Sequence, residues 1–101
     1  MFESTSKRYM TRMVAETIHI EIQNILWGLI DEQRQKNLKL DYLQVFELEA
    51  KKGKQYIIHK QEVPESKLKW CFQLKDTTPI NQTLWCIDSE THQTMLLPSD
   101  Y

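Results

Sequence analysis

The distribution of apolar side chains in the first third of the chain predicts one long helix. Thr17 or Glu16 is placed to begin it, and Asn37 is a residue type that often ends a helix. Between them, six aliphatic side chains fall on one side of a helix: Ile18, Ile22, Ile25, Leu26, Leu29 and Ile30. A stripe of this kind indicates a helix that packs against another layer of the fold.

Five runs rich in aromatic and β-branched residues follow this helix and are typical of strands. They span residues 41–49, 55–63, 67–74, 83–88 and 93–97, and a shorter run at 8–13 precedes the helix. The segments "AKKGK" around Gly53 and "DSETH" suit hairpin loops of three to five residues. Pro64 and Pro79 separate runs, because proline donates no hydrogen bond to a neighbouring strand.

Successive strands with short links predict an antiparallel meander of five to six strands, with the one N-terminal helix packed on one of its faces. The fold class expected is therefore α+β. A chain of 101 residues is long enough for one core, and residues 1–101 are expected to form a single domain.

The strands carry more apolar side chains than one sheet face can hold. Leu68, Trp70, Phe72 and Leu74 alternate cleanly, but the other runs place apolar residues on both faces, and one helix covers only one of them. On the helix, Ile20 and Trp27 point away from the main stripe, and Gly28 beside Trp27 would admit another backbone. Exposed apolar surface usually marks an interaction site, so Ile20 and Trp27 are candidates for self-association as a homodimer, beside a protein partner. A sheet curled over its own second face is the alternative.

The formal charge of −1 disfavours a dedicated nucleic-acid binder. The charge is unevenly distributed, with seven lysines and two glutamates in residues 51–75 and four acids without Lys or Arg from Asp76 onward. Asp88, Glu90, Asp100 and the terminal Tyr101 are therefore candidate contacts to a cationic partner. The alternative is a solvated surface whose charges pair within the fold.

A signal peptide and a membrane span are both missing from the pattern, which predicts a cytoplasmic protein without membrane contact. Cys71 and Cys86 are then expected to be reduced core thiols. The histidines have no metal-ligand spacing and there is no glycine-rich phosphate loop, so neither metal nor cofactor is expected.

Two other function classes stay open. His59 with Asp88, or His92 with Glu90, could form the His–carboxylate pair of a small hydrolase. A sheet-based RNA- or DNA-binding protein is suggested by a constellation of lysines and aromatic residues: Lys51, Lys52 and Lys54 at a hairpin tip, Tyr56 beside it, and Lys67, Lys69 and Trp70 further along. Nucleic-acid contact is the less favoured reading.

Several segments together resemble a known family. They are "RYMTR", "LWGLIDE", "LDYLQVFEL", "IIHKQEVPE", "LWCID" and "QTMLLPSDY", and they extend from Arg8 to Tyr101. In this order they are similar to a small uncharacterised family of Firmicutes and their mobile elements, known as domain of unknown function 960. Members often begin the helix with proline where this chain has His19.

The resemblance implies a context and no catalytic residues. Small cofactor-free proteins of phages and conjugative elements are often inhibitors of a host defence system. By this analogy the chain is expected to be a non-enzymatic protein-binding module, such as an anti-CRISPR protein acting on a type II effector nuclease or its guide-RNA complex. Such an inhibitor would compete for the cationic channels that hold RNA and DNA, and the acidic C-terminal region could supply carboxylates to them.

Overall fold

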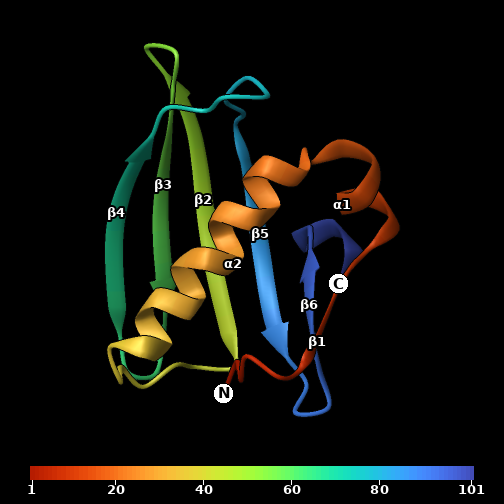
Figure 1. Cartoon of the computed structure of the whole chain (residues 1–101), viewed down its shortest axis with the longest axis vertical. Coiled ribbons are helices and arrows are strands. Elements are labelled where there is room, and N and C mark those ends of the chain that lie inside the picture. The colour runs from red at the N-terminus through yellow and green to blue at the C-terminus, as the bar shows by residue number, and fades with distance from the viewer.

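In the computed structural model, which describes residues 1–101, a long helix lies diagonally across one face of a six-stranded sheet (Figure 1). This arrangement is α+β, as the sequence predicts. The elements in chain order are β1 (Lys7–Met10), α1 (Arg12–Thr17), α2 (Ile20–Gln35), β2 (Leu43–Lys51), β3 (Lys54–Gln61), β4 (Ser66–Phe72), β5 (Gln82–Asp88), β6 (His92–Leu96) and the 3-10 turn η1 (Pro98–Asp100).

The strands lie in the order β1-β6-β5-β2-β3-β4, and every neighbouring pair is antiparallel except β1 with β6. The predicted meander is wrong beyond β4, because β5 pairs with β2 and not with the strand that precedes it. Residues 73–81 carry the chain back across the end of the sheet (Figure 1). Turn residues show where a strand ends, but they do not show which edge the next strand joins.

The single helix of the prediction is divided into two. The Thr11 hydroxyl accepts a hydrogen bond from Val14 N at 3.3 Å and caps α1, so Arg12 and Met13 are helical and do not belong to the first strand. The backbone is extended at Ile18 and His19, and His19 Nδ1 accepts a hydrogen bond from Glu21 N at 3.0 Å to begin α2. The predicted start at Thr17 or Glu16 is therefore wrong, because two cap residues divide the segment.

The hairpin between β2 and β3 is tighter than predicted. Lys51 pairs with Lys54, so the connection has two residues, Lys52 with φ 52° and Gly53 with φ 75°. Positive φ at both central positions is the type I′ geometry that matches the twist of the flanking strands. Gly53 tolerates this geometry because it has no Cβ.

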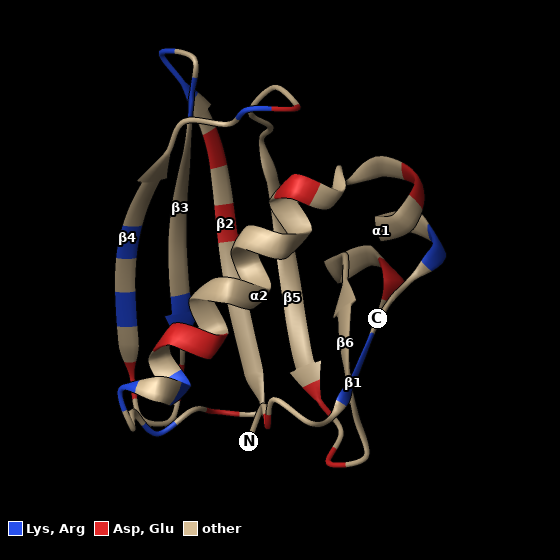
Figure 2. Cartoon of the chain, in the orientation of Figure 1, with Lys and Arg blue, Asp and Glu red and all other residues tan.

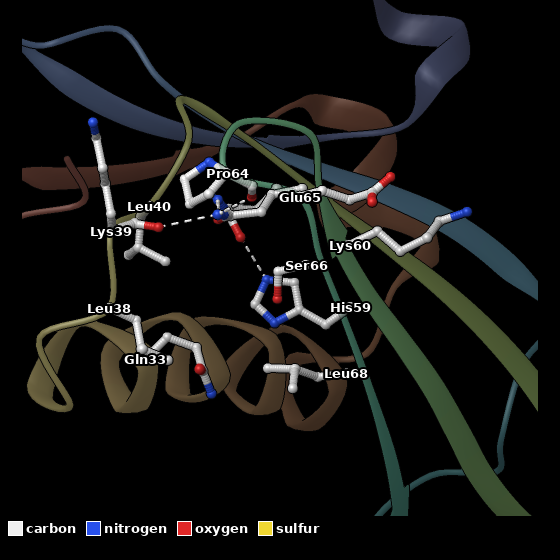
Figure 3. Close-up of a pocket in the computed structure, with 12 residues that line it drawn as sticks. Gln33, Leu38, Lys39, Leu40, His59, Lys60, Pro64, Glu65, Ser66 and Leu68 are labelled. Carbon is white, nitrogen blue, oxygen red and sulfur yellow. Dashed lines mark hydrogen bonds between the residues drawn. The ribbon is translucent and has the colours of Figure 1, made fainter.

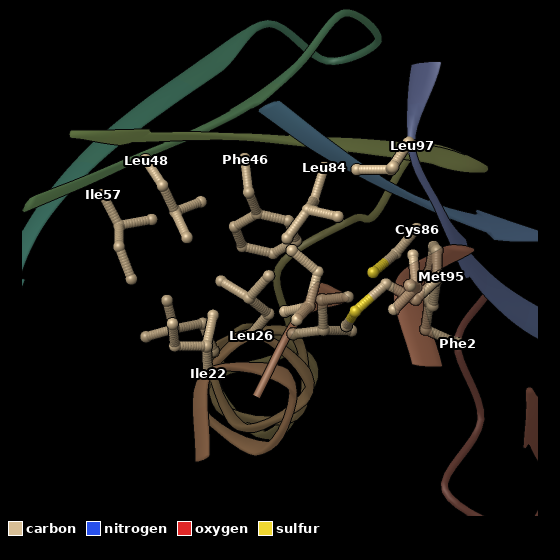
Figure 4. Close-up of a cluster of buried hydrophobic side chains, with 14 of the residues drawn as sticks. Phe2, Ile22, Leu26, Phe46, Leu48, Ile57, Leu84, Cys86, Met95 and Leu97 are labelled. Atoms are coloured by element: carbon tan, nitrogen blue, oxygen red, sulfur yellow. The ribbon is translucent and has the colours of Figure 1, made fainter. Parts of the chain in front are cut away.

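Side chains of α2 and of the sheet face beneath it form the core (Figure 4). Ile22, Leu26, Leu29 and Ile30 are buried, which confirms the predicted helical face. The sheet contributes Phe46, Leu48, Ile57, Leu84, Cys86 and Met95. Phe2 is also fully buried, and sequence reasoning missed it because the residues around it are polar.

Arg8 attaches the edge strand β1 to two other elements. Its Nε donates to Gln93 Oε1 on β6 at 2.8 Å, and its Nη1 donates to Asp31 Oδ2 on α2 at 3.0 Å. Its guanidinium lies over the Trp27 ring, 4.6 Å from the ring centroid. A short parallel strand at the edge of the sheet is thus held by a paired, partly buried cation as well as by its backbone.

The two cysteines lie in different environments. Cys86 is buried in the core, and burial raises the pKa of its thiol, whereas Cys71 is exposed on the opposite face of the sheet. The prediction of a core thiol is correct for Cys86 and wrong for Cys71. Neither α1 nor α2 has the length and apolar character of a membrane-spanning helix.

Two alanine substitutions on α2 are expected to change stability in opposite directions. Leu26 is fully buried, so Leu26→Ala should lower the free energy of unfolding by about 2–5 kcal/mol. Gly28 is exposed and an added Cβ meets no atom within 4 Å. Gly28→Ala should therefore raise the free energy of unfolding by about 0.5–1 kcal/mol.

Urea unfolding followed by circular dichroism measures both changes under one condition. No other part of the chain lies against Gly28, so approach of a partner's backbone at this glycine stays a prediction. A destabilised Gly28→Ala variant would show that the helix surface at this position is occupied.

Candidate functional site

The sheet face turned away from α2, here called the outer face, carries apolar and aromatic side chains that neither α-helix covers. Strand register assigns them, because directly paired residues point to the same face. Seven of them are Tyr9, Leu43, Val45, Tyr56, Ile58, Trp85 and Ile87, and an eighth, Leu96 opposite Trp85, is only 7% exposed. None of the seven is buried, so the expectation of apolar residues on both faces is confirmed, and the curled sheet that hides its own second face is not what forms.

A groove of about 1080 Å³ crosses the outer face. Leu43, Val45 and Trp85 line it, together with Pro98 of η1, and the rest of its lining is polar: Glu47, Lys60, Gln61, Glu62, Glu65, Ser66, Lys67 and Thr83. The terminal Tyr101 meets the Trp85 ring edge-on, with 5.7 Å between the ring centroids. The C-terminal turn therefore borders this groove. Tyr101 lies beside the groove and is 79% exposed.

Charges surround the apolar centre unevenly. Lys67 and Lys69 project from the outer face of the edge strand β4, while Glu47 and Glu49 project from β2 near the middle of the sheet. Figure 2 shows these cations and carboxylates as separate bands on the two strands. Glu47 pairs with Lys60 at 2.8 Å, whereas Lys67 and Lys69 have no carboxylate partner. Lys51 and Lys54 at the hairpin tip and Lys7 on β1 point to the same face and are likewise in no ion pair.

The acidic residues predicted to meet a cationic partner do not form one surface. Asp88 is 8% exposed and accepts hydrogen bonds from the backbone N–H groups of Phe2 and Glu90. Asp100 accepts from the Thr11 hydroxyl at 2.7 Å and from Leu97 N at 3.0 Å. Glu90 is exposed in the turn before β6, at the other end of that strand from Asp100. The Asp88 carboxylate is therefore buried within the fold, whereas Asp100 is exposed and its contact with a partner stays a prediction.

Ile20 and Trp27, the predicted self-association residues, are in different situations. Ile20 begins α2 and is 54% exposed. Trp27 packs against the edge of the core and is covered on one side by the Arg8 guanidinium. Self-association through Ile20 and Trp27 stays a prediction.

Lys51, Lys52 and Lys54 lie at the exposed tip of the β2–β3 hairpin, as predicted. Trp70, which was grouped with them as a base-stacking residue, lies on the inner face of β4 and packs against the core. Tyr56 is on the outer face, where a hydrogen bond with Cys71 raises the pKa of its phenol. Lys51, Lys54, Tyr56, Lys67 and Lys69 therefore share the outer face, and Trp70 is the member of the predicted arrangement that points to the other side of the sheet. Nucleic-acid contact by these residues stays a prediction.

Neither His–carboxylate pair forms. His59 Nε2 lies 2.6 Å from Gln44 Oε1, and Asp88 lies two strands away at the far end of β5. His92 Nδ1 lies 2.9 Å from the Thr91 hydroxyl, and its ring meets Tyr9 edge-on at 5.6 Å. The acid–base arrangement that a small hydrolase needs is therefore not built from these residues.

His59 is instead part of a buried polar group that sequence reasoning missed. It is 4% exposed, it stacks on Phe46 with 4.3 Å between ring centroids, and burial lowers its pKa to about 4. Gln44 and Gln61 are buried beside it. The available signal was the presence of polar residues at strand positions whose alternation places them under the helix.

Comparison with known proteins identifies the family. The model of the family described as "Staphylococcal protein of unknown function (DUF960)" matches residues 7–100, and the chain belongs to this family. This confirms the resemblance of the sequence segments. The fold is similar to that in the "Crystal structure of the protein of unknown function from Enterococcus faecalis", with a TM-score of 0.88, 22% identity, and coverage of 99% of this chain and 94% of that chain. A search of curated proteins finds no match.

The buried His59 predicts a pH-dependent stability. The folded-state pKa of His59 is about 4, below the ordinary value of 6.5. Between pH 4 and 6.5, His59 is therefore protonated in the unfolded chain but neutral in the folded chain. The free energy of unfolding should therefore be highest above pH 6.5 and should fall as the pH is lowered toward 4. His59 should account for about 2–3 kcal/mol of this decrease. Urea unfolding at several pH values measures the slope.

His59→Gln keeps an amide N–H that can reach Gln44 and removes the titrating ring, so its stability should vary less over this pH range. His92→Gln, on the other face of the sheet, is the matched control and should keep the wild-type slope. Equal slopes for wild type and His59→Gln would contradict the assignment.

Proposed function

We propose that this protein is a non-enzymatic binding module that docks a protein partner on the outer face of its sheet. The observation that carries the proposal is the uncovered apolar centre of that face. Seven half-buried or exposed apolar and aromatic side chains lie together there, and contiguous exposed patches of this type are characteristic of interaction surfaces. The groove beside Trp85 adds a concave region in which a side chain of the partner can bury.

The distribution of charge favours a partner of a particular kind. Lys67 and Lys69 offer unpaired cations at the β4 side, so a matching partner places carboxylates there around an apolar patch. Glu47 and Glu49 stand close to the apolar centre and would repel the phosphates of a nucleic acid. The aliphatic side chains Leu43, Val45 and Ile58 likewise suit a protein surface better than unstacked bases.

The narrower form of the proposal follows the family resemblance. In this form the protein is cytoplasmic, is carried by a mobile element, and inhibits a host defence enzyme such as a type II effector nuclease. Because Asp88 is buried and the exposed Asp100 already accepts two hydrogen bonds, inhibition here depends on the outer face, with Glu90, Asp100 and Tyr101 as the exposed members of the predicted acidic end. Steric blocking by a docked module is then the mechanism, and not mimicry of a nucleic-acid backbone.

A matched pair of lysine substitutions tests the docking surface. Ile58→Lys places a charge in the middle of the outer face, and Ile20→Lys places the same charge on α2, where the side chain is 54% exposed. Both sites avoid the core, so both variants should fold. For a partner identified by capture and then purified, calorimetry should show Ile58→Lys weakening binding about tenfold or more, because burying an unpaired charge is costly. Ile20→Lys should bind like wild type.

Three results would point elsewhere. A partner that binds Ile58→Lys and wild type equally would exclude the outer face. Salt-sensitive binding of random RNA or DNA oligonucleotides would favour the nucleic-acid binder instead. A concentration-dependent dimer in light scattering that only Ile58→Lys disrupts would show that the occupant is a second copy of the chain.

The narrower form has its own assay. Cleavage of target DNA by a purified type II effector nuclease with its guide RNA should slow when the protein is added, and Ile58→Lys should restore cleavage. Unchanged cleavage with wild-type protein would reject the nuclease as the partner without bearing on docking at the outer face.

A further inference from the structure

A second concave site lies on the opposite side of the sheet, between α2 and the β3–β4 hairpin. This inner pocket has a volume of about 240 Å³ and is lined by Gln33, Leu40, Gln44, His59, Gln61 and Leu68, among others (Figure 3). It shares none of the seven apolar side chains of the outer face. Its polar lining is unusual for the layer between a helix and a sheet, where buried polar atoms require partners.

Hydrogen bonds fix the orientation of the Gln61 carboxamide. Its Nε2 donates to Lys39 O at 3.0 Å and to Pro64 O at 2.7 Å, and both of these atoms are acceptors only. The other end of the carboxamide is therefore the oxygen. Gln61 Oε1 accepts from Gln44 Nε2 at 2.9 Å and from Asp41 N at 3.2 Å.

The same reasoning passes through Gln44 to His59. Gln44 Nε2 donates to Gln61 Oε1 and to Asp41 O, at 2.9 Å in each case, so Gln44 presents its oxygen to the imidazole. A bond of 2.6 Å between that oxygen and His59 Nε2 requires the ring nitrogen to carry the hydrogen. His59 is thus held as the tautomer protonated at Nε2, and Nδ1 is left as a bare acceptor.

His59 Nδ1 has no hydrogen-bond partner and no contact with bulk solvent. In Figure 3 it is the ring nitrogen without a dashed line, and it points toward the α2 side of the pocket, between Gln33 and Leu68. Nδ1 does not take up a proton near neutral pH, because burial lowers the pKa of the ring to about 4, so this nitrogen stays an acceptor without a donor. Stacking on Phe46 holds the ring in place.

We propose that the inner pocket binds a small uncharged molecule that donates an N–H or O–H hydrogen bond to His59 Nδ1. The Gln33 carboxamide beside it offers both a donor and an acceptor, and Leu40 and Leu68 supply apolar contact. The ligand class is a small lactam, cyclic imide or nucleobase, in which N–H and C=O groups are adjacent. A carboxylate would face the lone pair of Nδ1. Lys39, Lys60 and Glu65 also line the pocket but are not buried, and the buried polar side chains around the pocket are uncharged, which favours a neutral ligand.

The volume of the pocket fits a small organic molecule better than a single bound water. Drug-sized ligands occupy about 300–1,000 Å³, so this pocket suits a smaller molecule. A water has a share of liquid volume of about 30 Å³, so one water on Nδ1 would leave most of the pocket unfilled. Leu68, which lines the pocket together with His59, belongs to the edge strand β4, and we expect a change of its side-chain rotamer to give a ligand access to Nδ1.

Nitrogen-15 NMR of the His59 ring tests the proposal directly. The free protein should show one protonated and one bare ring nitrogen, assigned to Nε2 and Nδ1. Titration with uracil and with 2-pyrrolidone should shift the Nδ1 resonance in the direction of an accepted hydrogen bond. The N-methylated counterparts, 1,3-dimethyluracil and N-methylpyrrolidone, lack the donor and should bind about tenfold more weakly, without this shift.

In the wild type, the Leu68 side chain can keep the probes from reaching Nδ1. The titrations are therefore repeated with Leu68→Ala, which shortens this side chain and changes none of the carboxamides. A response of Nδ1 to the N–H probes in either protein, absent with the methylated probes, supports the site. Equal responses to methylated and unmethylated probes overturn the proposal. So does a Nδ1 resonance that stays constant in both proteins, which would show a hydrated pocket only.

Discussion

The chain has one long helix and a six-stranded sheet, and the helix covers only one of the two sheet faces. The difference between the buried inner face and the accessible outer face follows from this arrangement. The aliphatic stripe of α2 buries the inner face, and the first and last segments of the chain add Phe2 and Leu97 to the same core. The outer face receives only the short C-terminal turn, so its apolar residues stay available to another molecule.

The ends of the inner layer are closed by glutamine side chains. Gln55 exchanges hydrogen bonds with both backbone groups of Ile80 and so holds the link between β4 and β5. Gln93 donates to Glu3 O and holds the N-terminal segment, and Gln61 holds the backbone at Lys39 and Pro64. A carboxamide satisfies a backbone N–H and a C=O at once without bringing a charge into the core. This explains why the strands are polar where their alternation predicts apolar residues.

The sequence was informative where local rules decide the structure. The five strands after the helix lie within one to two residues of their predicted bounds, and the apolar stripe of the helix identified its buried face. It was uninformative about pairs remote in the chain, such as β5 on β2 or Arg8 on Asp31, because no local pattern encodes a partner. The internal partners of the C-terminal acids were missed for the same reason. Asp88 and Asp100 have partners in the first eleven residues, and a count of charges along the chain does not reveal them.

The parallel pair of β1 and β6 joins the two ends of the chain, since Lys7 lies opposite His92 and Met10 opposite Met95. Contacts this far apart in sequence give the fold a high contact order at this edge and slow its closure. During synthesis, β1 is made long before β6, so it has no neighbour to pair with until β6 follows. Until then β5 has an unpaired edge and Phe2 has no complete core to enter, so the partly synthesised fold is prone to aggregation at this edge.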